Sequence, residues 1–85
     1  MKERTVTVQI NDGLDAGTIA VLVQRSCKYT SSVYLQTEGK KVNAKSIMGM
    51  MNIGVSRGGE ITIIVDGEDE DQAMEEIAEF IENAK

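Results

Sequence analysis

The 85-residue sequence contains no histidine, and this absence removes several kinds of catalytic and metal site at once. A serine–histidine or cysteine–histidine nucleophile pair is impossible without an imidazole base. Structural zinc is held mainly by histidine and cysteine, and the chain has a single cysteine. We therefore expect no nucleophile pair of this kind, no metal and no other cofactor.

Disulfides, membrane spans and a basic surface are missing as well. One cysteine cannot form an internal disulfide, and a reduced thiol fits the cytosol. No apolar run approaches the roughly 18 residues that span a bilayer, and the N-terminus lacks a signal-peptide pattern. Fourteen acidic residues against nine basic ones give a net charge of −5, which argues against nucleic-acid binding. The composition predicts a cytoplasmic protein with no nucleic-acid or membrane partner.

One acidic stretch, Asp66–Asp71 (DGEDED), superficially resembles a calcium loop. It lacks the glycine at the sixth position and the regular spacing of oxygen ligands that such a loop requires. We expect no calcium site there. At 41% hydrophobic and 27% charged, the chain has the composition of an ordinary globular protein, and its length suits one domain.

Hydrophobic periodicity predicts elements in the order β-α-β-β-α-β-α. Strands are expected at residues 5–10, at 31–38, around residue 42 and at 60–65. Helices are expected at 16–27, in a short segment opened by Ser46, and from about residue 69 onward. Strands joined by hairpins, with helices of this length, favour an α+β fold in which the helices pack on one face of a sheet.

The expected core comes from one face of each element. The buried face of the first strand is expected to carry Val6, Val8 and Ile10. The first helix is expected to bury Ile19, Ala20, Val23 and Cys27, with the cysteine acting as a small buried hydrophobe. The last helix is expected to bury Ala73, Met74, Ile77, Ala78 and Ile81.

The most distinctive motif runs from Gly39 to Ile63, GKKVNAKSIMGMMNIGVSRGGEITI. With VLVQ…KYTSSVYL before it, GL…A ahead of the first helix and GEDEDQAMEEIAEFI near the C-terminus, it closely resembles HPr, the phosphocarrier of the bacterial sugar phosphotransferase system. The resemblance covers essentially the whole chain, so residues 1–85 are expected to form a single HPr-like domain. It implies a four-stranded antiparallel sheet with three helices on one face.

The chain departs from HPr at the segment that carries phosphate. The family has Gly-Leu/Ile-His-Ala-Arg-Pro-Ala there, and its histidine accepts a phosphoryl group from enzyme I. Here Asp15 occupies the histidine position, Gly17 the arginine position, Thr18 the proline position and Ile19 the alanine position. A carboxylate is a weaker nucleophile than imidazole, and glycine supplies no guanidinium. The resemblance therefore implies a non-enzymatic protein without a catalytic residue, and it puts enzyme I in doubt as a partner.

Three roles are open for Asp15. Its carboxylate can cap the first helix by accepting from free backbone N–H groups. It can also mimic, as a fixed negative charge, the phosphorylated histidine for some partner. Finally, it can accept phosphate itself as an acyl phosphate, since carboxylates serve as nucleophiles in some phosphoryl-transfer proteins.

Ser46 matches the regulatory serine that a dedicated kinase/phosphorylase modifies in HPr of low-GC Gram-positive bacteria. Its alternative role is structural, because a serine directly before IMGMMN is placed to cap a short helix. A phosphate at this position would carry −1.5 to −2 charges and face the free N–H groups of that helix. Lys41 and Lys45 are expected nearby as additional cations.

Large apolar residues follow Ser46 at positions 47, 48, 50 and 51. They cannot all lie on one face of a two-turn helix, so some must be exposed. One interpretation buries Met50 or Met51 in the core. The resemblance implies the other, in which Ile47, Met48 and Met51 belong to the surface by which HPr proteins bind their partners.

A missing histidine and a retained serine are together most similar to the histidine-lacking, catabolite-repression branch of the HPr family. The resemblance implies a regulatory module switched at Ser46 by HPr kinase/phosphorylase, with a catabolite control repressor as partner. That branch keeps an arginine where this chain has Gly17, so binding here is expected to be weaker or the partner different. The alternatives are a phosphocarrier that uses Asp15 and a binding module that needs no phosphorylation; whether the chain is a monomer or a strand-swapped dimer is open.

Overall fold

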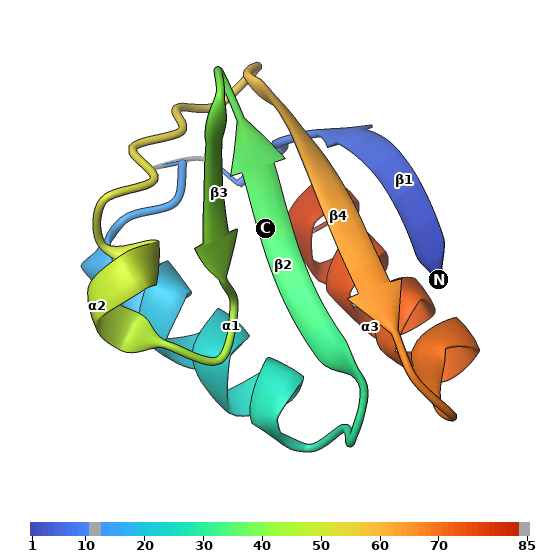
Figure 1. Ribbon diagram of the computed structural model, residues 1–85. Helices are drawn as coiled ribbons and strands as arrows, with labels where there is room; N and C mark the ends of the chain where they lie inside the picture. Colours follow the sequence, from blue (N-terminus) through green and yellow to red (C-terminus); the bar gives the residue numbers. More distant parts are fainter. Residues whose placement is uncertain (11–12, 84–85) are drawn as a thin grey trace.

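Four antiparallel strands form one sheet in the order β1-β4-β2-β3 in the computed structural model, which describes residues 1–10 and 13–83. The strands are β1 (Lys2–Thr7), β2 (Ser32–Thr37), β3 (Lys40–Asn43) and β4 (Glu60–Asp66). The helices of this part of the chain are α1 (Ala16–Cys27), α2 (Ile47–Met50) and α3 (Glu70–Asn83), and they lie on one face of the sheet (Figure 1). The predicted α+β fold and element order are confirmed. The domain prediction also spans residues 11–12 and 84–85, which lie outside the described residues.

Strand β4 forms the centre of the sheet because it pairs with β1 on one side and β2 on the other. Ile63 faces Arg4 across one ladder and Leu35 across the other. The run of β-branched residues in β4 suits a strand with neighbours on both sides. Ile63 and Leu35 are fully buried under the helices.

Helix α3 covers β1 and β4 with the face that the sequence predicts. The five residues of that face are all buried: Ala73, Met74, Ile77, Ala78 and Ile81. No helix within the described residues is long and apolar enough to cross a membrane.

The first strand lies earlier than its apolar alternation predicts. Val6, Val8 and Ile10 are buried as expected, but the strand itself spans Lys2–Thr7. Pairing with β4 determines these bounds, because Lys2 faces Val65 at one end of the ladder and Thr7 faces Glu60 at the other. Backbone pairing extends a strand through charged residues that carry no hydrophobic signal.

Helix α1 buries only part of the predicted face: Ala20 and Val23 are half-buried, with Val23 packed against the core. Ile19 is buried as expected, but its buried companions are Leu22 and Ser26, whereas Cys27 is exposed. One residue along a helix is a rotation of about 100°, so turning Ser26 inward carries Cys27 out of the core. The prediction of a buried cysteine is therefore wrong. Ser26 is fully buried, and within the described residues its hydroxyl has no hydrogen-bond partner.

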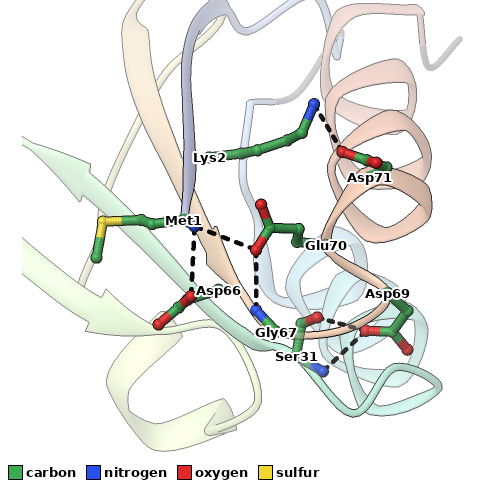
Figure 2. Close-up of polar contacts among 8 residues, drawn as sticks. All are labelled: Met1, Lys2, Ser31, Asp66, Gly67, Asp69, Glu70 and Asp71. Atoms are coloured by element: carbon green, nitrogen blue, oxygen red, sulfur yellow. Dashed lines mark hydrogen bonds and ion pairs between the residues drawn. The ribbon is translucent and has the colours of Figure 1, made fainter.

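The connection between β4 and α3 is held by several polar contacts (Figure 2). The carboxylate of Asp69 accepts the backbone N–H groups of Thr30 and Ser31, each at 2.9 Å, and the hydroxyl of Ser31. These bonds lower the pKa of Asp69 to about 2, with the Ser31 hydroxyl as the largest cause. They join the start of β2 to the start of α3. Lys2 of β1 also pairs with Asp71, with its Nζ 2.6 Å from a carboxylate oxygen.

Candidate functional site

Asp15 caps helix α1. Its backbone is extended, with φ −81° and ψ 178°, and its Oδ1 accepts the backbone N–H of Thr18 at 2.8 Å. The main-chain carbonyl of Asp15 accepts the N–H of Ile19, also at 2.8 Å. The hydrogen bond from the Thr18 backbone N–H is the main cause that lowers the pKa of Asp15 below its usual value, and a bond from the Thr18 side chain is the second cause. The exposed carboxylate is therefore charged, and one of its oxygens is engaged in the cap.

Gly13 and Leu14, directly before Asp15, are held against the loop that precedes β4. The N–H of Leu14 donates to the carbonyl of Val55 at 2.9 Å, and the Leu14 side chain is buried. Gly13 has a φ of +68°, and a Cβ built there would lie 2.7 Å from the carbonyl oxygen of Val55. Only glycine suits this close approach and this left-handed backbone. The segment therefore presents Asp15 from a fixed position.

Gly17 leaves open space beside Asp15. A Cβ built on Gly17 would meet only Oδ1 of Asp15, at 3.8 Å, so a side chain would fit there without a clash. Its glycine identity is thus not required by packing. In the described part of the chain, no ion pair is made by the Asp15 carboxylate. The site has an anion where the family motif has a histidine, and a glycine where that motif has an arginine.

Ser46 caps the one-turn helix α2. Its backbone is extended, and its Oγ accepts the N–H of Gly49 at 3.4 Å, which is a long hydrogen bond. Asn43 shapes the approach: its carbonyl accepts the N–H of Ser46 at 3.0 Å, and its side chain accepts the N–H of Lys45 at 2.8 Å. The Ser46 side chain remains exposed. An exposed hydroxyl in so weak a bond is accessible to modification.

The two lysines expected beside Ser46 bind elsewhere. The Nζ of Lys45 donates to the main-chain carbonyl of Tyr29 at 2.7 Å, beyond the end of α1. The Nζ of Lys41 lies 4.9 Å from the ring centroid of Tyr34, a cation–π contact on the open face of the sheet. Neither contact could be predicted from sequence, since each lysine is near Ser46 in the chain but binds a residue of another element.

Helix α2 presents an exposed apolar patch, hereafter the α2 patch, formed by Ile47, Met48 and Met51. These side chains are 48%, 80% and 51% exposed, whereas Met50 is fully buried. The core position therefore belongs to Met50, one of the two residues that the first interpretation named. Helix α2 packs against α1 and lies beside its first turns (Figure 1). Val21 on α1 is another exposed apolar side chain, which the sequence analysis missed because a single valine gives no pattern.

Known proteins match this chain over nearly its whole length. Residues 2–83 match the family model described as the PTS HPr component phosphorylation site. The chain belongs to the HPr family. The HPr-like protein Crh of Bacillus subtilis is 46% identical over 82 residues, which is 96% of this chain and 96% of that protein.

Solved structures of HPr-family proteins share the fold. The phosphocarrier protein HPr of Bacillus anthracis superposes with a TM-score of 0.92 at 34% identity, covering 95% of this chain and 96% of that one. Crystalline Crh of Bacillus subtilis, described as a swapped dimer, gives a TM-score of 0.76 at 47% identity, covering 95% of this chain and 93% of its own. In this HPr-family chain β1 pairs with β4 of the same chain, and its shape is closer to the phosphocarrier than to the swapped Crh.

The structure also brings together residues that sequence analysis did not single out. At the end of α1, Arg25, Lys28 and Tyr29 all donate to the carboxylate of Glu76 on α3. Arg25 also lies over the ring of Phe80, with its Cζ 4.9 Å from the centroid. About 50 residues of sequence separate these donors from Glu76, so their meeting depends on the packing of α1 against α3.

Proposed function

We propose that this protein is a non-enzymatic regulatory member of the HPr family, acting in the cytoplasm, that is switched by phosphorylation of Ser46 and cannot carry phosphate on a histidine. The observation that carries this proposal is a contrast between two helix caps. Asp15, at the position of the family histidine, is an ionised carboxylate bound to the N–H of Thr18. Ser46 has an exposed hydroxyl in a long hydrogen bond beside an apolar surface.

The switch works by adding charge at the border of the α2 patch. A phosphate on Ser46 brings −1.5 to −2 charges and three acceptor oxygens, which suit the arginine or lysine side chains of a partner. Methionine side chains adapt to differently shaped surfaces, so Met48 and Met51 can supply apolar contact to the same partner. Lys45 stays bound to Tyr29 in this mechanism, and the cations come from the partner. Phosphorylation thus creates a docking feature without a change of fold.

The partners follow from the family. HPr kinase/phosphorylase is the proposed modifying enzyme, and a catabolite control repressor is the proposed regulatory target. Relatives named HPr-like protein Crh support this assignment. The glycine at position 17 removes an arginine that such relatives use at the repressor, so we expect weaker binding from this chain than from an arginine-containing relative.

Labelling with the kinase tests the switch. Wild-type protein should accept label from HPr kinase/phosphorylase, Ser46→Ala should accept none, and Ser56→Ala should be labelled like the wild type. Ser56 is a matched control because it is an exposed serine on another loop. Equal labelling of the Ser46→Ala variant and the wild type would refute the proposal.

Binding to the repressor then separates a phosphorylation switch from a constitutive binding module. The phosphorylated protein should bind the repressor, and the unphosphorylated protein should bind at least tenfold more weakly. In the phosphorylated protein, Met48→Ala should weaken binding to the repressor relative to the phosphorylated wild type. Gln36→Ala, on the open face of the sheet, should not. Because Met48 is 80% exposed, its truncation should leave the fold intact. Equal binding by both forms would favour the phosphorylation-independent module.

A phosphocarrier that uses Asp15 is the second candidate, and it is favoured by the exposure of that carboxylate. Incubation with enzyme I and labelled phosphoenolpyruvate distinguishes it. We expect no label; a hydroxylamine-sensitive label that is lost in Asp15→Asn would identify an acyl phosphate and favour this candidate.

A further inference from the structure

A groove of about 620 Å³ lies between α1 and α3 and shares no lining residue with the α2 patch. Its lining comes from the second half of α1, the second residue after that helix and the outer face of α3: Arg25, Tyr29, Gln72, Glu75, Glu76, Glu79 and Phe80. Helix α1 lies between α2 and α3 (Figure 1), so the groove and the α2 patch can be occupied at the same time.

One carboxylate of the groove, that of Glu76, is already paired with cations of the chain itself. Glu76 accepts from Tyr29 and from Arg25, the latter at 3.3 Å, and Lys28 lies 3.0 Å from it. Hydrogen bonding to Glu76 raises the pKa of Tyr29 to about 12, so its hydroxyl remains a donor at neutral pH. With two cations bound to one carboxylate, this part of the groove has no free carboxylate to offer a ligand.

Two other carboxylates of α3 in the lining, those of Glu75 and Glu79, are free. Glu75 and Glu79 lie one turn apart and are exposed, and neither takes part in a hydrogen bond or ion pair of its side chain within the described part of the chain. The lining therefore carries three carboxylates against one guanidinium. The half-buried ring of Phe80 lies in the same groove and supplies apolar and π surface.

Arg25 demonstrates which chemistry this combination binds. Its guanidinium lies over the ring of Phe80 at 4.9 Å and reaches the carboxylate of Glu76, so an aromatic face and a glutamate hold one cation. Glu75 and Glu79, one helical turn apart, line the same groove as Phe80, so carboxylates and an aromatic ring are again available together. A negative groove with an aromatic floor is complementary to a cationic side chain with an apolar stem.

We propose that the groove between α1 and α3 docks a short basic segment of a partner protein, with an arginine or lysine side chain bound by Glu75 and Glu79 beside Phe80. The segment would lie between the two helices, and its remaining side chains would cover Gln72 and Tyr29. This surface is independent of Ser46 and of the state of Asp15. It would allow the protein to hold one partner through the α2 patch and a second through the groove.

Titration with a synthetic peptide tests the groove directly. An acetylated, amidated tetra-arginine peptide is added at low ionic strength to uniformly ¹⁵N-labelled protein, and amide shifts are followed by NMR. We expect saturable shifts concentrated at Arg25, Tyr29, Glu75 and Phe80, and none from a tetra-glutamate peptide. Shifts centred on another face, spread evenly over the surface, or absent would overturn the proposal.

Charge-matched variants separate a specific groove from the general negative charge of the protein. The double variant Glu75→Gln/Glu79→Gln should weaken tetra-arginine binding about three- to tenfold. The double variant Glu3→Gln/Glu60→Gln removes the same charge from the open face of the sheet and should change affinity less than twofold. Glutamine and glutamate have similar helix propensities, so the α3 variant should keep its fold. Equal weakening by both variants would reduce the effect to non-specific electrostatics and would refute the groove.

Discussion

Replacing Gly17 by alanine should stabilise the protein, although glycine is the residue present at the start of α1. Gly17 is the second residue of the helix, and within helices glycine is about 0.5–1 kcal/mol less favourable than alanine, an upper value for the first turn. A Cβ at this position meets nothing closer than 3.8 Å, so no packing penalty opposes the gain. The expected increase in unfolding free energy is about 0.5–1 kcal/mol, which corresponds to roughly 2–8 °C in Tm for a domain of this size.

The same change four residues earlier should have the opposite sign. Gly13 has a φ of +68°, which costs a residue with a Cβ about 1–2 kcal/mol. Its Cβ would also lie 2.7 Å from the carbonyl oxygen of Val55 and 2.9 Å from the Cα of Ser56, both backbone atoms. Backbone must move to relieve these contacts, and the bond from Leu14 to Val55 would be distorted. We expect Gly13→Ala to lose at least about 2 kcal/mol.

Urea unfolding, followed by circular dichroism, measures both variants against the wild type. The midpoint should rise for Gly17→Ala and fall for Gly13→Ala, while the slope of the transition stays constant. A matched pair of this kind removes the general effect of adding one methyl group. If Gly17→Ala lowered the midpoint, the open space beside Asp15 and the helical role of Gly17 would both be wrong.

Two further predictions concern Asp69 and the segment around Asp15 and Gly17. The pKa of Asp69 is lowered to about 2 by the Ser31 hydroxyl, so its contribution to stability is present above its usual pKa of 3.8 and is lost as the pH falls through about 2. Asp69→Asn should therefore flatten the acid limb of the stability profile between these pH values, measured by urea unfolding; an unchanged limb would contradict the hydrogen bonding of Asp69. Asp15→His/Gly17→Arg should accept phosphate from enzyme I and phosphoenolpyruvate, whereas Gly17→Arg alone should not, because the arginine stabilises a transferred phosphoryl group but cannot accept it. A labelled Gly17→Arg variant would show that the lost histidine is not what prevents transfer.

The helix caps could be predicted from the sequence because capping depends on neighbours. An N-cap needs only a short polar side chain and the next three backbone N–H groups, and both Asp15 and Ser46 meet this condition. The buried face of α3 is predictable for a similar reason. Apart from Phe80, its apolar residues recur at the helical period on one face, and that face is the observed inward one.

Helix α1 shows where periodicity stops being sufficient. Apolar residues occur on more than one side of it, at Ile19, Ala20, Val21, Leu22 and Val23. Several rotations therefore bury similar areas, and the choice depends on fit against the sheet and α3. The observed rotation places Ser26 inside and Cys27 outside, which no local rule requires.

By itself the sequence determined the α+β fold, the order of its elements, the two helix caps and the absence of the imidazole that a phosphocarrier needs. Only the tertiary structure decided that Met50 is the buried methionine, that Lys45 binds Tyr29, and that free carboxylates of α3 lie in one groove with Phe80. The difference has a simple physical reason. Periodicity and capping depend on residues within about one helical turn, whereas side-chain partners across the core are chosen by packing between segments far apart in the chain.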